Sequence, residues 1–551
     1  MSETRKCTIT NQDFEISDKE IAMCKQLDVP LPNMCQEERI RTLMSTRNEW
    51  KLYRRKCDFT AGEIISAYPP DTSFTIYTNE VWWGNEWDAT TYGRDYDFNR
   101  PFFEQFAELQ KVVPREGTTV FSSENCDYNC HIRESKNCFL NSLVYQCEDL
   151  YYSYWCVHDK DVFDSYCVNE SELCYNCISL NNSHGCIMVE ESNSCSNCHF
   201  CYQCTGCKNC LFSTNLANKE YYIFNKQRTK EEFEEMKAKI FNGGWDRWQD
   251  AYRHYLEIRK NAPQRYVQLI NDENCTGDHL YNSRNCENCY EGFDSEECVN
   301  CVSLSKATSI HSCYSAGWPD CPGPAYMSVV SRGCQDIAFC NYTWFSSNMR
   351  YSDSNNACDS CFGSIGLQHK KYCILNKQYT KEEYEELVLK IIKHMKSTGE
   401  WGQFFPINLF TYAYNESAAM DFYPLTKDEA LRLGYKWRSK DEKEYQPPTI
   451  SEIPNNINDV FDDFNEEILA CEKCSKNYKV IKQELDFYRK MNLPIPRDCS
   501  ECRHRARFDI RNPLRLFDRK CDKCNADMKT SYSPDRPEQV YCEECYLKEV
   551  Y

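Results

Sequence analysis

The sequence lacks long hydrophobic runs, and its 551 residues include no stretch of eighteen apolar residues of the kind that a membrane-spanning helix needs. Residues 1–20 are mostly polar and charged, unlike a secretory signal peptide. We therefore expect a cytoplasmic protein without membrane contact. In that reducing compartment, cysteines serve as metal ligands or buried thiols more often than as disulfides.

Motifs for enzyme chemistry are also missing. The chain has no glycine-rich phosphate loop, no Gly-x-Gly-x-x-Gly, no His-Glu-x-x-His and no Gly-x-Ser-x-Gly. An enzyme assignment therefore has no residues to rest on. The excess of 84 acidic over 65 basic residues gives a net charge of −19. This excess argues against general coating of nucleic acid, but it leaves room for a local basic patch.

Cysteine, by contrast, is abundant, with 39 residues, and the chain also carries 14% aromatic residues. Two duplications organise it, and the first joins the two ends. At a constant offset of 464, residues 47–60 (RNEWKLYRRKCDFT) align with residues 511–524 (RNPLRLFDRKCDKC), and Cys35 aligns with Cys499. We therefore predict one similar module at each end of the chain.

The second duplication lies between these modules. Residues 218–236 (NKEYYIFNKQRTKEEFEEM) and residues 369–387 (HKKYCILNKQYTKEEYEEL) share twelve of nineteen positions. Each segment contains a Thr-x-x-Glu capping box, at Thr229 and at Thr380, which predicts that a helix ends each repeat. A third box at Thr426 predicts a short helix in the segment that follows.

Four Cys-x-x-Cys pairs lie near the C-terminus. A two-residue gap lets both thiolates of a tight turn face one ion, and two such turns complete the tetrahedral sulfur shell of Zn²⁺. The last two pairs are separated by seventeen residues, a usual spacing for zinc sites, and the first two by twenty-four, with a helix expected at 481–491. We predict two structural zinc sites, closed to water. Their ligands are Cys471, Cys474, Cys499, Cys502, Cys521, Cys524, Cys542 and Cys545.

The N-terminal module has lost most of these ligands. We therefore expect a degenerate zinc-ribbon-like module that apolar packing holds together without metal. The equivalent positions hold Cys7, Thr10, Cys35, Glu38, Cys57, Thr60, Thr78 and Val81.

The central cysteines recur at intervals of nine to eleven residues, a period that no helix can use. We predict a parallel β-solenoid in which two strand-and-turn units of about nine residues make one coil and cysteines stack inside. A rival interpretation is a metal site, an iron–sulfur cluster or a thiol redox centre, although the Cys-Pro that often completes cluster motifs is absent. It rests on the run Cys195, Cys198, Cys201, Cys204, Cys207 and Cys210.

Both end modules contain a basic strip. One interpretation is that these side chains neutralise phosphates of a nucleic acid, and the other is that they pair with the acidic residues of the chain itself. The C-terminal strip contains Arg503, Arg505, Arg507, Arg511, Arg515 and Arg519, and the N-terminal strip contains Arg39, Arg41, Arg47, Lys51, Arg54 and Arg55.

Several aromatic strings, at residues 82–88, 92–106, 399–406 and 414–437, together with the cysteine pairs, resemble a family of cysteine-rich proteins with zinc ribbons from candidate-phyla-radiation bacteria. The resemblance spans nearly the whole chain. It implies zinc ribbons, but no function, because the family is functionally uncharacterised. We expect the aromatic strings to pack between the end modules and the repeats.

Together these patterns predict a mixed α+β fold, with zinc-ribbon-like modules at both ends flanking a duplicated cysteine-rich β-solenoid-like region with capping helices. The expected domains are 1–82 (degenerate module), 83–118 (connector), 119–262 and 263–400 (repeats), 401–440 (connector), 441–467 (acidic linker) and 468–551 (double zinc ribbon). We expect a non-enzymatic zinc-binding scaffold with a protein or ribonucleoprotein partner. Alternatives are an iron–sulfur or thiol redox protein, and a structural component of a large assembly.

Overall fold

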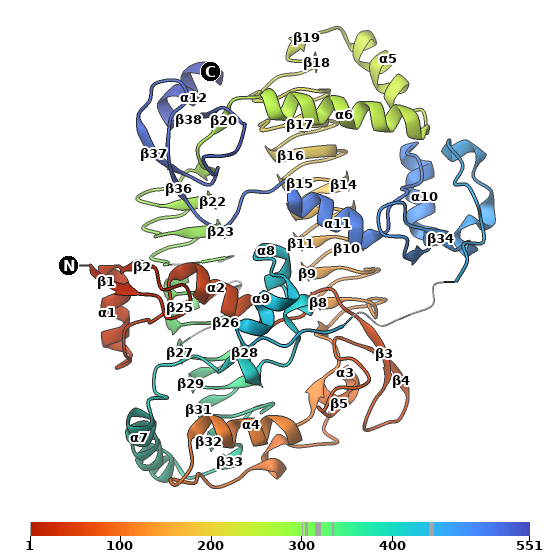
Figure 1. The fold of residues 1–551 in the computed structure, drawn as a ribbon. Coiled ribbons are helices and arrows are strands. Elements are labelled where there is room, and N and C mark those ends of the chain that lie inside the picture. Colours follow the sequence, from red (N-terminus) through yellow and green to blue (C-terminus); the bar gives the residue numbers. More distant parts are fainter. Residues whose placement is uncertain are drawn as a thin grey trace.

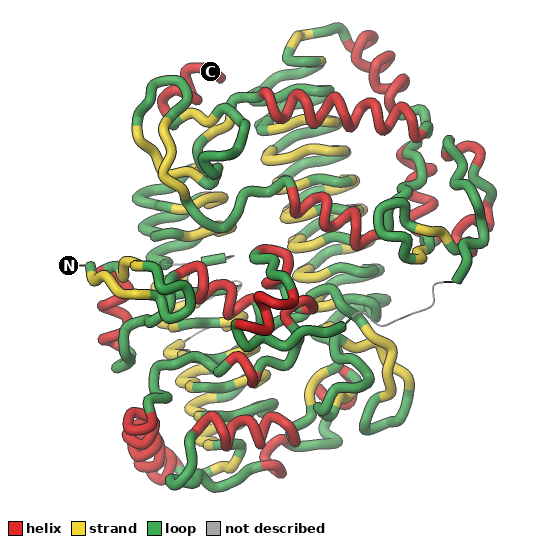
Figure 2. Tube along the Cα trace, viewed as in Figure 1, coloured by secondary structure: helices red, strands yellow, loops and turns green. Residues whose placement is uncertain are grey.

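The computed structural model describes residues 2–299, 301–302, 307–314, 321–332, 335–439 and 446–550 of a mixed α/β protein. Two columns of stacked strands stand side by side, and the helices and terminal segments lie around them (Figures 1 and 2). None of the described helices combines the length and the apolar character needed to cross a membrane.

The first column is a curled parallel sheet of eleven strands, formed by the first repeat. Its strands are β7 (Val120–Phe121), β8 (Cys130–Arg133), β9 (Ser142–Tyr145), β10 (Glu148–Tyr151), β11 (Tyr154–Val157), β12 (Lys160–Phe163), β13 (Tyr166–Asn169), β14 (Glu172–Tyr175), β15 (Ile178–Asn181), β16 (Ile187–Asn193) and β17 (His199–Tyr202).

The strands of this sheet pair with a step of twelve residues. Glu148 in β10 pairs with Lys160 in β12, which pairs with Glu172 in β14. From Leu140 to Phe224, every third residue has a positive φ. Each twelve-residue step therefore contains four left-handed corners, separated by short extended segments.

The residue after each corner belongs to a buried core. The side chains at these positions are at most 2% exposed in Val144, Leu150, Cys156, Val162 and Val168. They form one cluster with other apolar residues that directly follow a corner. The predicted coil of two nine-residue units is therefore wrong. Inward-facing positions recur every three residues. Cysteines can therefore recur every nine residues, because nine is a multiple of three.

One cysteine of the predicted series does not fit. Cys167 has a positive φ, so it occupies a corner and packs in a different apolar cluster from the inward cysteines. The interval of eleven residues between Cys156 and Cys167 reflects this change of position.

The second column is built from the second repeat, in three sheets whose strands pair in parallel, except that the last strand, β33, pairs antiparallel with β32. Its strands are β21 (Leu269–Ile270), β22 (Gly277–Tyr281), β23 (Cys289–Phe293), β24 (Ala307–His311), β25 (Cys321–Tyr326), β26 (Val329–Arg332), β27 (Gln335–Ala338), β28 (Asn341–Trp344), β29 (Ser347–Arg350), β30 (Asp353–Asn356), β31 (Asp359–Phe362), β32 (Lys371–Ile374) and β33 (Lys377–Gln378). Between β27, β29 and β31 the step is again twelve residues.

Helices begin and end the repeats. The predicted capping boxes are confirmed at Thr229, Thr380 and Thr426, where hydroxyl and carboxylate satisfy backbone amides at the helix start. The helices are η1 (Ala89–Tyr92), α4 (Phe102–Val112), α5 (Lys230–Ile240), α6 (Trp245–Asn261), α7 (Lys381–Thr398), η2 (Ile407–Leu409), η3 (Tyr414–Glu416), α8 (Ala419–Phe422) and α9 (Lys427–Arg432). Two short strands, β18 (Tyr222–Ile223) and β19 (Lys226–Gln227), precede α5.

The two terminal modules have the same order of elements. The N-terminal module contains β1 (Glu3–Lys6), β2 (Asp13–Ile16), α1 (Asp18–Gln26), α2 (Gln36–Met44), β3 (Tyr53–Lys56), β4 (Glu63–Ser66), β5 (Ile76–Tyr77) and α3 (Asn79–Trp83). The C-terminal module contains β34 (Leu469–Ala470), β35 (Asn477–Tyr478), α10 (Lys482–Met491), α11 (Ser500–Asp509), β36 (Phe517–Lys520), β37 (Asp527–Thr530), β38 (Val540–Tyr541) and α12 (Glu543–Val550). Strands β3, β4 and β5 recur as β36, β37 and β38 at the offset of 464.

Each module also joins the start of one repeat in the same way. Strand β5 pairs in parallel with β6 (Arg115–Glu116), and β38 pairs in parallel with β20 (Gln264–Arg265). In Figure 1 strands β3 to β5 lie near the start of the first repeat and strands β36 to β38 lie near the start of the second repeat, at opposite corners of the molecule. The chain is therefore a doubled unit whose two halves correspond in space.

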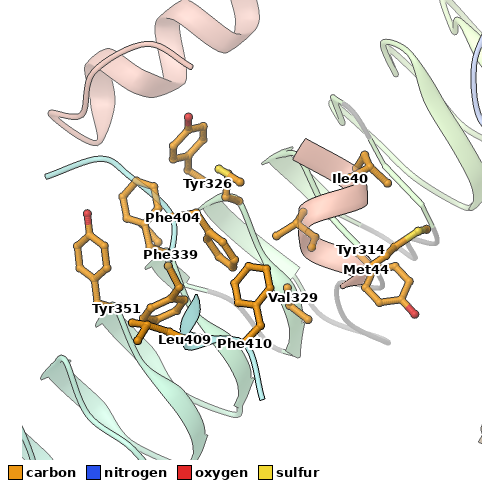
Figure 3. Close-up of a cluster of buried hydrophobic side chains, with 14 of the residues drawn as sticks. Ile40, Met44, Tyr314, Tyr326, Val329, Phe339, Tyr351, Phe404, Leu409 and Phe410 are labelled. Carbon is orange, nitrogen blue, oxygen red and sulfur yellow. The ribbon is translucent and has the colours of Figure 1, made fainter. Parts of the chain in front are cut away.

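Aromatic side chains of the connectors fill the space between module and repeat, as the sequence predicts. Figure 3 shows Phe404 and Phe410 between Phe339 of the second repeat and Ile40 of α2. The predicted acidic linker is only partly described, because residues 440–445 lie outside the described residues. The rest of it is mostly exposed or half-buried, but Ile457 and Phe464 are buried against the C-terminal module in η4 (Ile457–Asp459) and η5 (Asp462–Glu466).

We predict that Phe102→Ala destabilises the protein by about 3–5 kcal/mol, because the ring is fully buried among Phe106, Tyr351 and Phe362 and its loss leaves a cavity. Val112→Ala is the matched control on the same helix, since Val112 is 42% exposed. Urea unfolding of both variants measures the difference. Equal losses would contradict docking of α4 through Phe102.

Candidate metal centres

The first two cysteine pairs meet through a turn and a helix start. At the turn, the amide of Ser475, a residue with a φ of 60°, donates to the carbonyl of Cys471, and the amide of Cys471 donates to Lys476. Cys499 is the N-cap of α11, and Cys502 lies in the first turn of that helix. The turn therefore presents Cys471 and Cys474 to the helix start.

The last two pairs repeat this arrangement. Asn525, with a φ of 59°, closes the turn after Cys521, and Cys542 directly precedes α12, which carries Cys545 in its first turn. Helix N-termini carry a partial positive charge that favours thiolates. Both groups thus combine a tight turn with a helix start, which is the local chemistry that a thiolate shell requires.

In each group the four sulfur atoms lie within 4.8 Å of one another. The distance from Cys474 Sγ to Cys499 Sγ is 3.7 Å, and that from Cys524 Sγ to Cys542 Sγ is also 3.7 Å. Tetrahedral zinc with bonds of about 2.3 Å places its sulfurs about 3.8 Å apart. All eight predicted ligands therefore come together in two groups of four that fit a metal ion of this size.

Backbone amides support the thiolates. The amide of Cys499 donates to Cys471 Sγ, and the amide of Cys542 donates to Cys521 Sγ, each over 3.3 Å. For Cys521, burial raises the pKa, but the amides of Cys542, Cys524 and Lys523 outweigh it and bring the pKa down to about 6. Such hydrogen bonds to ligand atoms orient the shell and favour the deprotonated form that binds metal.

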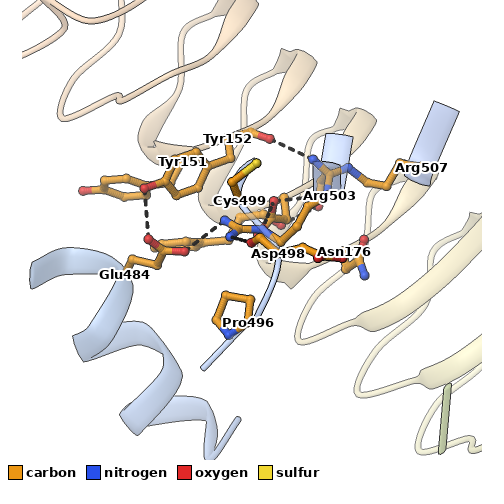
Figure 4. Close-up of polar contacts among 12 residues, drawn as sticks. Tyr151, Tyr152, Asn176, Glu484, Pro496, Asp498, Cys499, Arg503 and Arg507 are labelled. Carbon is orange, nitrogen blue, oxygen red and sulfur yellow. Dashed lines mark hydrogen bonds and ion pairs between the residues drawn. The ribbon is translucent and has the colours of Figure 1, made fainter. Parts of the chain in front are cut away.

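The first four-cysteine group is tied to the first repeat through α11. Arg503 and Arg507, which follow Cys502 along the helix, both contact the carboxylate of Asp164 at 3.0 Å, and Arg503 also contacts Glu484 at 3.0 Å (Figure 4). Asp164 and Glu484 are only 1% exposed. The position of the metal group is therefore coupled to a buried ion-pair network.

We predict that Asp164→Ala destabilises the protein by about 3–5 kcal/mol, because it leaves the buried guanidinium of Arg507 without its carboxylate. Asp161→Ala is the matched control. Asp161 occupies the preceding corner, but it pairs with the exposed Lys490 at 3.4 Å, so its loss should cost less than about 1 kcal/mol. Chemical denaturation compares the two, and a reversed order would contradict the role given to the network.

The N-terminal module keeps the turns without the four ligands. The amide of Cys57 donates to Gly62 just as that of Cys521 donates to Ala526, and the amides of Thr60 and Thr78 point at Cys57 Sγ. Within the described part of the chain, the geometry brings together three or more metal-ligating groups only in the two C-terminal sets. Zinc-binding modules at both ends are therefore not observed.

The run from Cys195 to Cys210 lies inside the first repeat. Every cysteine in it is at most 1% exposed, and each thiol contacts the backbone carbonyl nine residues further along, as Cys198 does with Cys207 and Cys201 with Cys210. Burial raises the pKa of Cys201 well above its ordinary value. Hydrogen bonds from Cys204 and Cys210 instead lower the pKa of Cys207 to about 3. The burial suits core thiols, and the run is not one of the groups that could hold a metal among the described residues.

The predicted basic strips turn largely inward. Arg39 is 2% exposed and contacts Glu20, and Arg511 contacts Glu291 of the second repeat. Apart from Arg54, every side chain of the two strips lies within 4.0 Å of a carboxylate among the described residues. The remaining pairs are Arg41–Glu38, Arg47–Glu49, Lys51–Glu501, Arg55–Asp58, Arg505–Asp421, Arg515–Glu37 and Arg519–Asp522.

The sequence did not indicate the partners of these arginines. Asp164, Glu291 and Asp421 lie in other segments, and no local spacing singles them out. The sequence does contain one signal for Asp164, because this residue falls on one of the corners that recur every three residues. Recognising that signal requires the three-residue period, which the spacing of nine to eleven residues between the cysteines hides.

Comparisons with protein-family models, with curated proteins and with solved structures found no match for this chain.

Proposed function

We propose that this protein is a zinc-dependent scaffold without enzymatic activity, in which two structural zinc ions fold the C-terminal module and that module braces two β-solenoids. The observation that supports it best is the sulfur–sulfur distance of 3.7 Å in both four-cysteine groups. Four thiolates leave no coordination position for water, and a closed shell of this kind serves structure and not catalysis.

The solenoid assignment rests on the pairing step. Strands twelve residues apart pair in parallel along both repeats, and four left-handed corners per step turn the chain back on itself. Repeats of this kind contact mainly their neighbours and present long, regular side surfaces. Such surfaces suit the binding of other macromolecules, which favours a scaffold role.

The preferred partner is a protein. A nucleic-acid contact would need free cations to neutralise phosphates, whereas the arginines that suggested it are engaged in internal ion pairs, as Arg503 and Arg507 are with Asp164. A nucleic-acid or ribonucleoprotein contact is thus the weaker proposal. Iron–sulfur or thiol redox chemistry has no favourable geometry in the run that suggested it.

We predict two zinc ions per chain in the purified protein and one in Cys521→Ser, measured by elemental analysis. Cys198→Ser is the matched control, because Cys198 is a buried core thiol outside both groups, and it should retain two zinc ions. Iron in place of zinc, or an equal loss from both variants, would refute the assignment.

We also predict that a strong chelator unfolds the C-terminal module, because the binding energy of structural zinc, about 10–16 kcal/mol in small domains, is folding energy. Hydrogen exchange should rise in α11 and α12 before it rises in α1 and α2 of the N-terminal module, which holds no four-cysteine group. Unchanged protection of α11 and α12 after the zinc is removed would contradict a structural role.

A further inference from the structure

A cavity of about 50 Å³ lies where the N-terminal module, both repeats and the second connector meet. By the measure in which one water takes about 10–15 Å³, it holds several waters or part of one small molecule. Aromatic side chains form much of its wall, and polar groups reach it from different elements. The residues used below are Trp83, Arg115, Glu116, His131, Asn341 and Trp344.

Three polar atoms of this lining have no hydrogen-bond partner among the described residues. They are Arg115 Nε, Trp344 Nε1 and Asn341 Oδ1. Arg115 is only 4% exposed, and its Nη2 contacts Asp353 at 2.9 Å. An unpaired buried polar group costs about 1–3 kcal/mol, so three around one cavity indicate a missing partner.

The duplicated half of the molecule supplies an internal comparison. A second cavity, of about 30 Å³, is lined by Tyr532, Arg265 and His279. Tyr532 aligns with Tyr68 at the offset of 464, and Arg265 and His279 align with Glu116 and Cys130 at an offset of 149, the offset that places β20 on β6; all three counterparts line the first cavity. The two cavities therefore occupy corresponding places.

In the second cavity the polar groups are paired with one another. Arg259 contacts Glu190 at 2.7 Å, His279 contacts Glu191 at 2.9 Å, and the Tyr532 hydroxyl donates to Gln264 at 2.9 Å. No buried polar side-chain atom of its lining is left without a partner among the described residues. The unpaired atoms are thus a property of the first cavity and not of the shared fold.

The groups around the first cavity favour low net charge at neutral pH. Burial raises the pKa of Glu116 to about 8, in spite of hydrogen bonds from Trp83 and Thr119, which favours the protonated carboxyl. Burial lowers the pKa of His131 well below its ordinary value, so the imidazole is neutral. The guanidinium of Arg115 is balanced by Asp353. A neutral ligand fits this environment better than an ion.

The unpaired atoms indicate which hydrogen-bonding groups such a ligand carries. Arg115 Nε and Trp344 Nε1 are donors and need an acceptor, whereas Asn341 Oδ1 is an acceptor and needs a donor. The indole rings of Trp83 and Trp344 lie nearly parallel, at 25° with centroids 6.3 Å apart, and provide flat apolar surface. We propose that this cavity binds a small, neutral, planar amide or lactam that presents a carbonyl oxygen beside an N–H group.

The test uses uracil as the probe and the full-length protein with its metal. We expect calorimetry to give a dissociation constant of about 1 mM or below, as suits so small a ligand. 1,3-Dimethyluracil keeps the ring and the carbonyls but has no N–H group, so it should bind at least about tenfold more weakly.

Variants locate the site. Trp344→Phe keeps a ring but removes the N–H donor, and Asn341→Leu removes the acceptor, and each should weaken uracil binding about tenfold. Tyr532→Phe alters the corresponding second cavity and should leave binding unchanged. No heat of binding at about 10 mM uracil, equal binding of dimethyluracil, or equal effects of Trp344→Phe and Tyr532→Phe would each overturn the proposal. Zinc content reports separately on the scaffold function, so the two proposals can fail independently.

Discussion

The left-handed conformation of every third residue in the repeats is the constraint on which the rest of the structure depends. Four such corners turn the chain within twelve residues and bring it into register with the strand before it. Non-glycine residues in this conformation cost about 1–2 kcal/mol each, and the cost is offset by a continuous parallel ladder and a buried core. One residue in three then points inward, and cysteine, serine, valine and leucine fill these positions. The abundance of cysteine follows from this geometry: a thiol is small and apolar, yet it can contact the carbonyls that the corners leave inside, as Cys198 does.

Polar contacts decide how the end modules dock on this framework. Arg503 and Arg507 reach Asp164 in the first repeat, Arg511 reaches Glu291 in the second, and none of these carboxylates is more than 3% exposed. Buried ion pairs add little net stability, because desolvation offsets their attraction, but a misplaced partner leaves a buried charge unpaired. The pairs therefore select one docking position. They also account for three arginines of the C-terminal basic strip, which pair with buried acids of the repeats.

The sequence was informative wherever a short segment carries its own physical signal. The capping boxes at Thr229 and Thr380 form as predicted, and the eight C-terminal cysteines come together in two groups of four, because a capping box and a Cys-x-x-Cys turn each depend on residues a few positions apart. The twelve-residue step was missed because cysteine occupies only some inward positions, and Cys167 occupies a corner. For the arginines the sequence left two interpretations open, and internal pairing was one of them. Some of the partners lie hundreds of residues away, as Asp164 does from Arg507, so local charge could not distinguish a solvated strip from a buried one.

Because the two halves share one architecture, the places where they differ show what each half requires. The C-terminal module brings four cysteines together in each of two groups, each formed by a turn and a helix start, whereas the N-terminal module keeps the turns without the ligands. In place of metal, the N-terminal module is anchored by Glu49, a fully buried carboxylate that accepts hydrogen bonds from Tyr154 of the first repeat and Tyr314 of the second and pairs with Arg47. The C-terminal module has Pro513 at the position of Glu49, so it cannot form this anchor. Both modules, too small for a large core of their own, are thus held against the repeats by buried carboxylates: Glu49 belongs to the N-terminal module itself, whereas Asp164 and Glu291 belong to the repeats that the C-terminal module contacts.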